Sequence, residues 1–396
     1  MVDAESPGAE CPDVDVVSLP APSSQRIGDQ TAAAGLLAAV GELVPSWQAN
    51  ADPPEDEDRF PLSELRDLHR LGAYDAPVPA RFGGLGLGTE PSGALYLLDL
   101  LRLIGRANLS LGRVFEGHVN ALALVSAYGT ELQARRAALD AAAGHLFAIW
   151  NTEADGGLRL IGTPPAARLR GGKTFCSAAG YAARALVTAR RSGKEASMLL
   201  LPLEPSQGVA GGAAPMQGMR ASVTASMRFD GMPVATSAVI GSPGDYLREP
   251  LFSAGAWRTS AVTLGGIEGL LTETRKQLVM RGRENSPHQK ARVGRAIIAE
   301  ESARLWLRKA AIVAESRRQA PDDAVGYVNL ARTAVETAAR EIITLVQRSL
   351  GLACLLQANP VERRLRDLTT YLRQPAPDAA LENGAARFMQ RPLPDG

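Results

Sequence analysis

The spacing of apolar residues changes twice along the chain and divides the sequence into three regions. From residue 31 to residue 128, alanine, leucine and valine recur at helical spacing. Between Phe147 and Val239, short runs of β-branched residues alternate with glycine pairs and prolines, a pattern typical of strands. After Tyr246 the helical spacing returns, in long segments near 251–284, 291–317, 325–351 and 360–372. We therefore expect a β domain inserted between two helical domains, the second of them an antiparallel bundle.

These changes predict an α+β fold made of four segments. Residues 1–26 are rich in proline, serine, alanine and acidic residues, and we expect them to be disordered. An N-terminal α-helical domain is expected over 27–143 and a middle β-barrel or sandwich domain over 144–240. A C-terminal four-helix bundle is expected over 246–396.

Two candidate strands in the middle region carry chemically different faces. Gly171 and Gly172 predict a hairpin turn, after which residues 174–179 alternate between a face with a ring and a hydroxyl and a face of small groups. Upstream, a strand that begins at Phe147 ends in the polar residues 151–153. Together the two strands could offer an aromatic wall and hydrogen-bond donors to a flat heterocycle. The alternative is an ordinary half-buried sheet.

Composition narrows the class of protein. The 396 residues are 45% hydrophobic with a formal net charge of +1, so no basic surface indicates nucleic acid or an anionic membrane. No apolar run reaches the roughly 20 residues that span a bilayer, and the acidic N-terminus does not resemble a signal peptide. Cys11, Cys176 and Cys354 are too scattered for a disulfide framework, and the four histidines are dispersed. We expect a soluble cytoplasmic protein without a metal site.

Several motifs resemble those of the acyl-CoA dehydrogenase superfamily. Trp150-Asn151-Thr152-Glu153 stands where that family has a Val-Thr-Glu motif, and Phe175-Cys176-Ser177-Ala178 stands where it has Trp-Ile-Thr-Asn after a Gly-x-Lys turn. The longest match is the segment 218–224 with Phe229 and Pro233-Val234, similar to the family's Gly-x-Arg-x-Ser-x-Thr…Phe…Val-Pro signature. Weaker matches lie at 79–86 and 360–367, so the similarity extends from about residue 30 to residue 390. It implies the same three-domain fold and a bound FAD.

The resemblance also implies roles for particular residues around the FAD. Thr152 and Ser177 would donate hydrogen bonds to the edge of the flavin ring and Phe175 would cover its face, with Trp150, Asn151 and Cys176 on the same two strands. The pyrophosphate would meet one group of residues after the first bundle helix and another in a turn that, in the family, reaches the cofactor of a neighbouring subunit. These residues are Arg281 and Arg283 in the first group, and Gln347, Arg348 and Gly351 in the second. The turn lacks two of the family's usual glycines, but it still implies a homo-oligomer, a dimer or a tetramer.

The family's catalytic base has no counterpart in this sequence. Its dehydrogenases remove an α-proton with a glutamate that follows an Arg-Asp pair, and Pro375 stands at that position after Arg366-Asp367. Other members place the base just before a retained arginine, here Arg258, which would contact the substrate; the residue before it is Trp257. Glu116 is the nearest candidate for a displaced base.

A histidine favours a second interpretation. Flavin monooxygenases of the same fold carry a histidine in a Gly-x-His context similar to that of His118, together with a serine or threonine on the flavin strand, here Ser177. A histidine with a pKa near 6.5 suits proton transfer at neutral pH. The alternative is a histidine packed within a helix without a catalytic part.

Three functions therefore remain open at this point. The first is an FAD-dependent oxidoreductase acting on an acyl thioester, such as an acyl-CoA or a carrier-bound acyl group, with a non-standard base. The second is a flavin-dependent monooxygenase with a flavin-reductase or electron-transfer partner. The third is a flavin-binding protein without catalytic activity.

Overall fold

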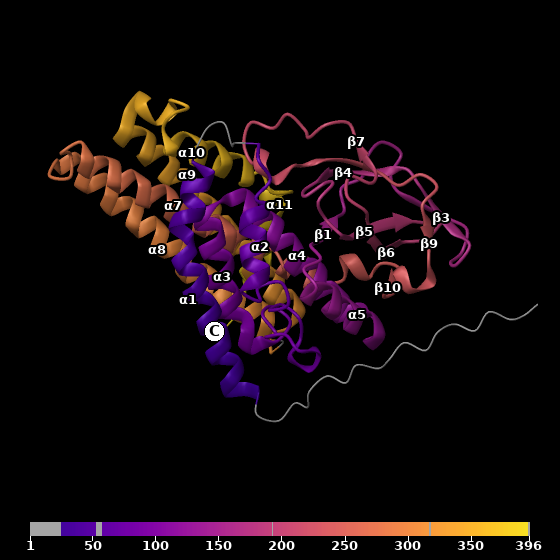
Figure 1. The fold of residues 1–396 in the computed structure, drawn as a ribbon. Coiled ribbons are helices and arrows are strands. Elements are labelled where there is room, and N and C mark those ends of the chain that lie inside the picture. Colours follow the sequence, from indigo (N-terminus) through magenta and orange to yellow (C-terminus); the bar gives the residue numbers. More distant parts are fainter. Residues whose placement is uncertain (1–24, 53–57, 192, 317, 395–396) are drawn as a thin grey trace, which may run out of the picture.

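The computed structural model describes residues 25–52, 58–191, 193–316 and 318–394. Apart from its last two residues, the segment expected to be disordered lies outside this description. Helices occupy both ends of the described chain and the strands lie between them in sequence. In space, the sheets form one side of the molecule and the long C-terminal helices the other, with the N-terminal helices beside them (Figure 1). The expected order of an α-helical, a β and a second α-helical part is confirmed.

The N-terminal part consists of helices, two of which are separated by a polar residue rather than by a glycine. Asn108 separates α3 from α4 and caps α4, because its side chain accepts the N–H groups of Ser110 and Leu111 at 2.8 and 3.3 Å. Gly105 stays inside α3, where an added Cβ would lie 2.3 Å from the carbonyl oxygen of Val262. The helices are α1 (Gln25–Ala51), α2 (Leu62–Arg70), α3 (Ala94–Ala107), α4 (Leu109–Tyr128) and α5 (Glu131–Ala142).

The strands form a seven-stranded sheet and a three-stranded sheet. The larger sheet has the order β10-β6-β5-β2-β3-β9, with β1 pairing in parallel with β5; the smaller sheet has the order β4-β8-β7. The strands are β1 (Phe147–Trp150), β2 (Arg159–Ile161), β3 (Ala167–Arg170), β4 (Gly172–Cys176), β5 (Arg184–Arg190), β6 (Ala196–Pro202), β7 (Val209–Ala210), β8 (Ala225–Arg228), β9 (Pro233–Val234) and β10 (Val239–Ile240).

The expected hairpin at Gly171-Gly172 is wrong, because the chain passes there from one sheet to the other. β3 pairs with β2 and β9, whereas β4 pairs with β8. Gly171 has φ +98°, and a Cβ on Gly172 would lie 2.2 Å from the carbonyl oxygen of Met227. The two glycines therefore allow a close backbone crossing rather than a two-residue turn.

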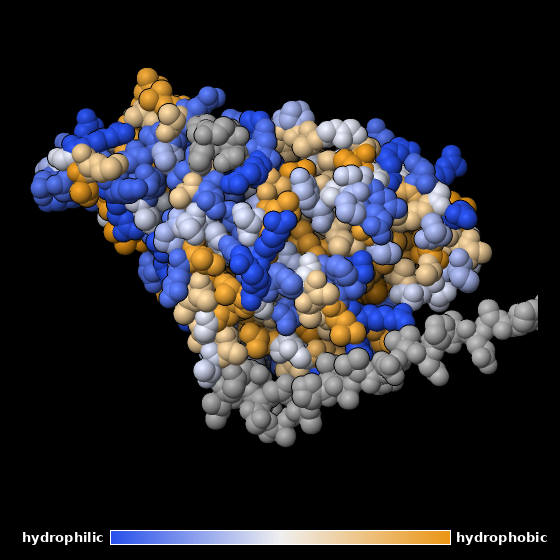
Figure 2. Space-filling view, in the orientation of Figure 1, coloured by the Kyte–Doolittle hydropathy of each residue, from blue (hydrophilic) through white to orange (hydrophobic). Residues whose placement is uncertain are grey.

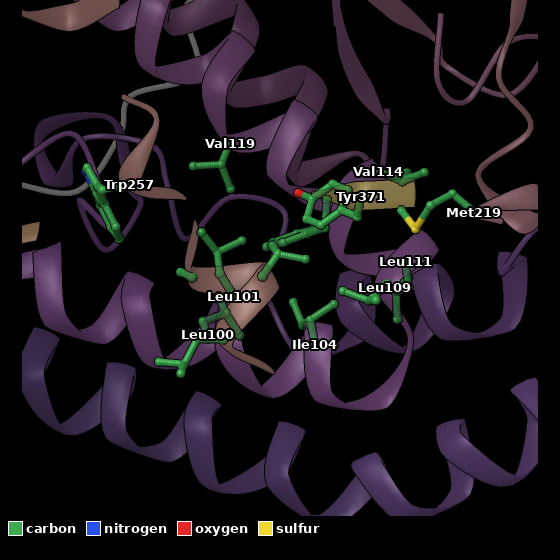
Figure 3. Packing of buried hydrophobic residues seen from close by; sticks show 14 of the residues in the cluster. Leu100, Leu101, Ile104, Leu109, Leu111, Val114, Val119, Met219, Trp257 and Tyr371 are labelled. Carbon is green, nitrogen blue, oxygen red and sulfur yellow. The ribbon is translucent and has the colours of Figure 1, made fainter. Parts of the chain in front are cut away.

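Long helices after residue 250 form the expected bundle. These helices are α6 (Leu251–Ala254), α7 (Trp257–Met280), α8 (Pro287–Ser316), α9 (Pro321–Leu350), α10 (Pro360–Tyr371) and α11 (Pro377–Phe388). Buried leucines, isoleucines and valines from α3 and α4 pack against Trp257 and Tyr371 in one continuous core (Figure 3). None of the described helices is long and apolar enough to cross a membrane.

The longest sequence motif attaches the β domain to α10. The N–H of Met219 donates to the Asp367 carboxylate at 2.6 Å, and Arg366 donates to the carbonyl oxygen of Gln217 at 2.7 Å. Gly218 lies so close to α10 that an added Cβ would be 2.5 Å from the carbonyl oxygen of Arg366. This signature therefore has a structural role at a domain junction.

Candidate functional site

The last residue of β1 and the residues that follow it lie beside β4, and a few hydrogen bonds join the two segments. The N–H of Thr174 donates to the carbonyl oxygen of Thr152 at 3.0 Å, and Trp150 Nε1 donates to the carbonyl oxygen of Ser177 at 2.9 Å. The two sequence segments expected to meet a flavin are thus neighbours in space.

A bulge in β4 turns an aromatic ring outward at this edge. The pairing of β4 with β8 shifts register between Lys173 and Cys176, and Phe175 within the bulge has φ +53°. The Phe175 side chain is 61% exposed. A positive φ is strained for a residue with a Cβ, and bulges often redirect side chains at binding sites. The exposed ring can therefore cover the face of a planar ligand.

Two hydroxyl groups accompany this ring. The side chain of Thr152 is exposed, and its hydroxyl makes no hydrogen bond to any described residue. Ser177 is partly exposed, and its Oγ lies 3.2 Å from the Thr224 hydroxyl. The edge thus presents an aromatic face and polar hydroxyls, which fits the mixed apolar and hydrogen-bonding surface of a flavin ring.

Two other residues predicted for the cofactor site are buried, and a third is exposed but bonded within the chain. Trp150 is buried against Phe229, and Cys176 is buried, which raises the pKa of its thiol to about 12. The Asn151 side chain accepts a hydrogen bond from Thr188 at 2.6 Å. The Trp150 and Cys176 side chains therefore support the two strands from behind, and a contact of these three residues with a flavin stays a prediction.

A cavity of about 170 Å³ lies between α4, the start of α7 and the outer face of β1. Ile149, on β1, forms one wall, directly before the buried Trp150. Phe252, Ala256 and Thr259 also line a second cavity of about 440 Å³ between α7, α9 and the segment after α10. The two cavities therefore share a wall at the start of the C-terminal bundle.

Glu116 lies at the first cavity, and both of its carboxylate oxygens are occupied. Arg113 donates to Oε2 at 2.5 Å, and Thr259 donates to Oε1 at 3.0 Å. Asn120 donates to Oε1 as well. Three donors from within the chain therefore occupy this carboxylate.

A second buried ion pair continues this network. Arg258 donates to Glu315 at 2.6 Å, to Asn120 at 3.0 Å and to the carbonyl oxygen of Gly88 at 2.9 Å. Trp257 is buried and donates its indole N–H to the same Glu315 at 3.1 Å. The arginine predicted to contact substrate therefore lines the cavity with most of its donors already used.

Two tyrosines near Glu116 were not anticipated from the sequence. Burial raises the pKa of Tyr246 to about 12 and raises that of Tyr371 as well. The Tyr371 hydroxyl lies beside Thr259 without a well-formed hydrogen bond. By contrast, the sequence does indicate the two donors to Glu116 on its own helix. Arg113 stands three residues before Glu116 and Asn120 four residues after it, so the three side chains share one helix face. Tyr246 and Tyr371 come from distant segments, so no spacing in the sequence relates them to Glu116.

His118 lies on a different face of α4 and is fully buried. The N–H of Phe147 donates to Nδ1 at 3.1 Å, so Nε2 carries the proton and donates to the carbonyl oxygen of Tyr74 at 2.8 Å. Burial lowers the pKa of His118 to about 4. Its burial and two hydrogen bonds disfavour a role as catalytic proton donor, and His118 joins α4 to β1.

Pro375 and Trp257, which occupy the two family positions for the base, have other surroundings in the structure. The carbonyl oxygen of Pro375 accepts a hydrogen bond from Arg332 at 2.6 Å, and Ala376 follows with φ +50°. Neither Pro375 nor the buried Trp257 offers a proton acceptor to the cavities.

The residues predicted for the pyrophosphate lie together, but far from β1 and β4. Arg281 ends α7 and reaches the carbonyl oxygen of Leu350, at the end of α9, at 3.5 Å. Arg283, Gln347, Arg348 and Gly351 are exposed at the same end of the bundle. The 24 residues of α7 span about 36 Å, and this end points away from the sheets (Figure 1). One chain does not bring the two groups together.

Comparisons with known proteins agree with this architecture. Residues 38–145 match the model of the acyl-CoA dehydrogenase N-terminal domain family. A search of curated protein sequences gave no significant match.

Solved structures match over nearly the whole chain. TdsC from Paenibacillus sp. A11-2 in complex with FMN and indole is 20% identical with a TM-score of 0.79, over 91% of this chain and 99% of that chain. KijD3 in complex with FMN and a dTDP-amino-keto sugar is 20% identical with a TM-score of 0.78, over 95% and 97%. Glutaryl-coenzyme A dehydrogenase in complex with glutaryl-CoA is 20% identical with a TM-score of 0.77, over 95% and 98%. The described chain therefore has the acyl-CoA dehydrogenase fold, and its residues 38–145 are similar to the acyl-CoA dehydrogenase N-terminal domain family.

Proposed function

We propose that this chain is a flavin-dependent monooxygenase acting on a small organic molecule. The bound flavin would supply the redox chemistry. Phe175 would cover one face of its ring, and Thr152 and Ser177 would bond its polar edge. The observation that carries the choice of reaction is the state of Glu116, whose two oxygens accept bonds from Arg113, Asn120 and Thr259.

Dehydrogenation of an acyl thioester needs a free base beside the substrate α-carbon. Among the described residues that line the two cavities, the carboxylates are Glu116 and Glu336, and Glu336 lies 3.5 Å from Arg373. Pro375 and Trp257 occupy the family positions for a base. Proton abstraction by this chain is therefore disfavoured. Transfer of an oxygen atom from O₂, with reduced flavin as the electron donor, requires no such base. TdsC, a dibenzothiophene monooxygenase that binds FMN, provides a precedent on this fold.

The charges around the cavities favour a substrate without phosphates. The charged side chains that line them are engaged within the chain, in the pairs Glu116–Arg113, Arg258–Glu315 and Glu336–Arg373 and in the bond from Arg332 to Pro375. A coenzyme A pyrophosphate is held best by cations that are free to bond it. Cavities of about 170 and 440 Å³ suit a compact molecule with an apolar part.

The proposal includes two protein partners. A separate flavin reductase would supply the reduced cofactor. A second copy of the chain would bring the residues at the end of its bundle to the phosphate end of the cofactor. If those residues contact the cofactor, it is FAD; if they do not, it is FMN. Exposed apolar side chains on α8, Ile298 at 69% and Leu305 at 60%, provide surface for such an assembly. Apolar and charged side chains mix on the face drawn in Figure 2.

Two reactions test the proposal. The flavin-loaded protein is mixed without oxygen with butyryl-CoA, octanoyl-CoA and glutaryl-CoA, and the flavin absorbance is followed. It is then supplied with a flavin reductase, NADH, ¹⁸O₂ and indole, and products are analysed by mass spectrometry. We expect the flavin to stay oxidised in the first reaction and one ¹⁸O atom to enter indole in the second.

A matched variant separates oxygenation by the protein from chemistry of free flavin. Ser177→Val is expected to lose at least the larger part of the labelled product, whereas Ser226→Val, at a neighbouring strand position on β8, should retain it. Rapid bleaching by any of the acyl-CoAs would contradict the proposal and favour a dehydrogenase. Loss of both reactions, with flavin still bound, would favour a non-catalytic flavin-binding protein.

A further inference from the structure

Lys173 is the second residue of β4, and its side chain has no exposed surface. Its Nζ atom lies 2.9 Å from Glu153 Oε1, donates to the Thr188 hydroxyl at 2.9 Å and donates to the carbonyl oxygen of Asn151 at 3.1 Å. Thr188 in turn donates to the Asn151 side chain at 2.6 Å. All three donors of the ammonium group are therefore used inside the β domain.

The partners of Lys173 surround one exposed residue. The Asn151 carbonyl belongs to the peptide bond that enters Thr152, and Glu153 directly follows Thr152 in the chain. The remaining side is fixed by the N–H of Thr174, which donates to the Thr152 carbonyl oxygen. Lys173 thus bonds the backbone carbonyl that precedes Thr152 and the Glu153 side chain that follows it, while the Thr152 hydroxyl is left unbonded among the described residues.

Burial of this ammonium group needs a reason, because an unpaired buried charge is strongly destabilising. Burial lowers the pKa of Lys173, while Glu153 opposes that effect. An apolar side chain of similar length would fill the same space. It would not bond the Asn151 carbonyl or Glu153. The segment 151–153 would then keep its backbone bridge to β4 but lose the bonds of the ammonium group on either side of Thr152.

We propose that Lys173 is a positioning residue, which fixes the Thr152 hydroxyl at the polar edge of the bound flavin ring through Asn151, Glu153 and Thr188. The proposal rests on the flavin binding proposed above. Lys173 itself does not touch the cofactor, because its ammonium group faces the interior behind the strands.

Lys173→Met tests this role, with FMN and FAD as probes. We expect the Kd for flavin, measured by fluorescence quenching, to rise about tenfold or more, because a displaced Thr152 no longer bonds the ring. At saturating flavin we also expect a shifted absorption maximum and a shifted reduction potential, which depend on hydrogen bonds to the ring. Thr188→Val, a milder change in the same cluster, should shift the spectrum in the same direction.

Arg184→Met is the matched control. Arg184, on β5 of the same domain, forms an ion pair with Asp140 on α5 at 2.7 Å, and it does not contact the segment 151–153. This variant should lower the unfolding temperature but leave the flavin spectrum unchanged. Lys173→Arg, which keeps the charge, should recover part of the affinity.

The outcomes separate the positioning role from flavin binding itself. An unaltered chain that binds neither FMN nor FAD would overturn both proposals. If the unaltered chain binds flavin but Lys173→Met and Thr188→Val leave spectrum and potential unchanged at saturation, only the positioning role is overturned. If Lys173→Met does not fold, Thr188→Val alone decides.

Discussion

At the scale of single residues, a buried neutral histidine links the stability of this chain to pH. His118 keeps both ring nitrogens bonded, to Phe147 and Tyr74, only while Nδ1 is free of a proton. Its folded pKa of about 4 lies below the ordinary value of 6.5. The unfolded chain therefore binds more protons between these values, and folding opposes protonation.

We expect the free energy of unfolding to fall as the pH is lowered from about 6.5 to about 4. A pKa shift of that size corresponds to about 3 kcal/mol, lost progressively across the window and fully present above it. Urea unfolding at a series of pH values measures the change. His118→Gln, which does not titrate, should flatten the profile in that window, and the control His288→Gln, at an exposed position, should not. An identical slope for all three chains would contradict the assignment.

The sequence could predict part of the site at this scale. The alternation along β4 and the polar end of β1 brought attention to Thr152, Phe175 and Ser177, which do lie at one edge; their contact with a flavin stays a prediction. The two hydrogen bonds of His118 could not be predicted, because its partners lie 44 and 29 residues away. Local spacing carries no information about such bonds, whereas the bonds to Glu116 from its own helix were visible in the spacing.

At the scale of elements, the glycines of this chain work mostly as contact points between elements. Gly105 and Gly218 allow close approach to α7 and α10, where any Cβ would meet a backbone carbonyl. From the sequence, Gly218 was identified only as the first residue of a family signature, without its contact with α10. The three-part order of elements followed from periodicity alone, while the passage of the chain between sheets at Gly171 depends on long-range pairing that periodicity does not encode.

Gly218→Ala is expected to destabilise the chain by about 1–3 kcal/mol, because the new methyl group would displace α10 from the β domain. Thermal or urea unfolding measures this loss. Gly212→Ala is the control, since nothing lies within 4 Å of a Cβ at Gly212 and its φ is not in the left-handed region. Equal stabilities for the two variants would show that the junction relaxes without cost.

At the scale of the whole molecule, the residues predicted to contact the cofactor lie in two distant places, and this has a direct consequence for the proposed site. β1 and β4 can meet the flavin ring within one chain, but Arg283 and Gln347 stand at the remote end of the bundle with exposed side chains (Figure 1). Only a second copy can bring that end to the ring site. The same end exposes Leu352 at 76% and further leucines, which suits an interface better than free surface.

This division predicts that Arg283→Ala and Gln347→Ala weaken FAD binding about tenfold each, because the pyrophosphate loses a donor from the second copy. FMN, which ends at a single phosphate close to the ring, should bind with unchanged Kd. Arg308→Ala, at an exposed position on α8 away from that end, serves as the control and should alter neither. Equilibrium titration with both cofactors, combined with light scattering, measures the outcome. A chain that remains a monomer while binding FAD more tightly than FMN would contradict the second-copy arrangement, since no described residue of one chain could then account for the preference. Equal affinity for the two cofactors in the unaltered chain and all three variants would instead identify FMN as the sufficient cofactor. The end of the bundle would then contribute to assembly but not to cofactor binding.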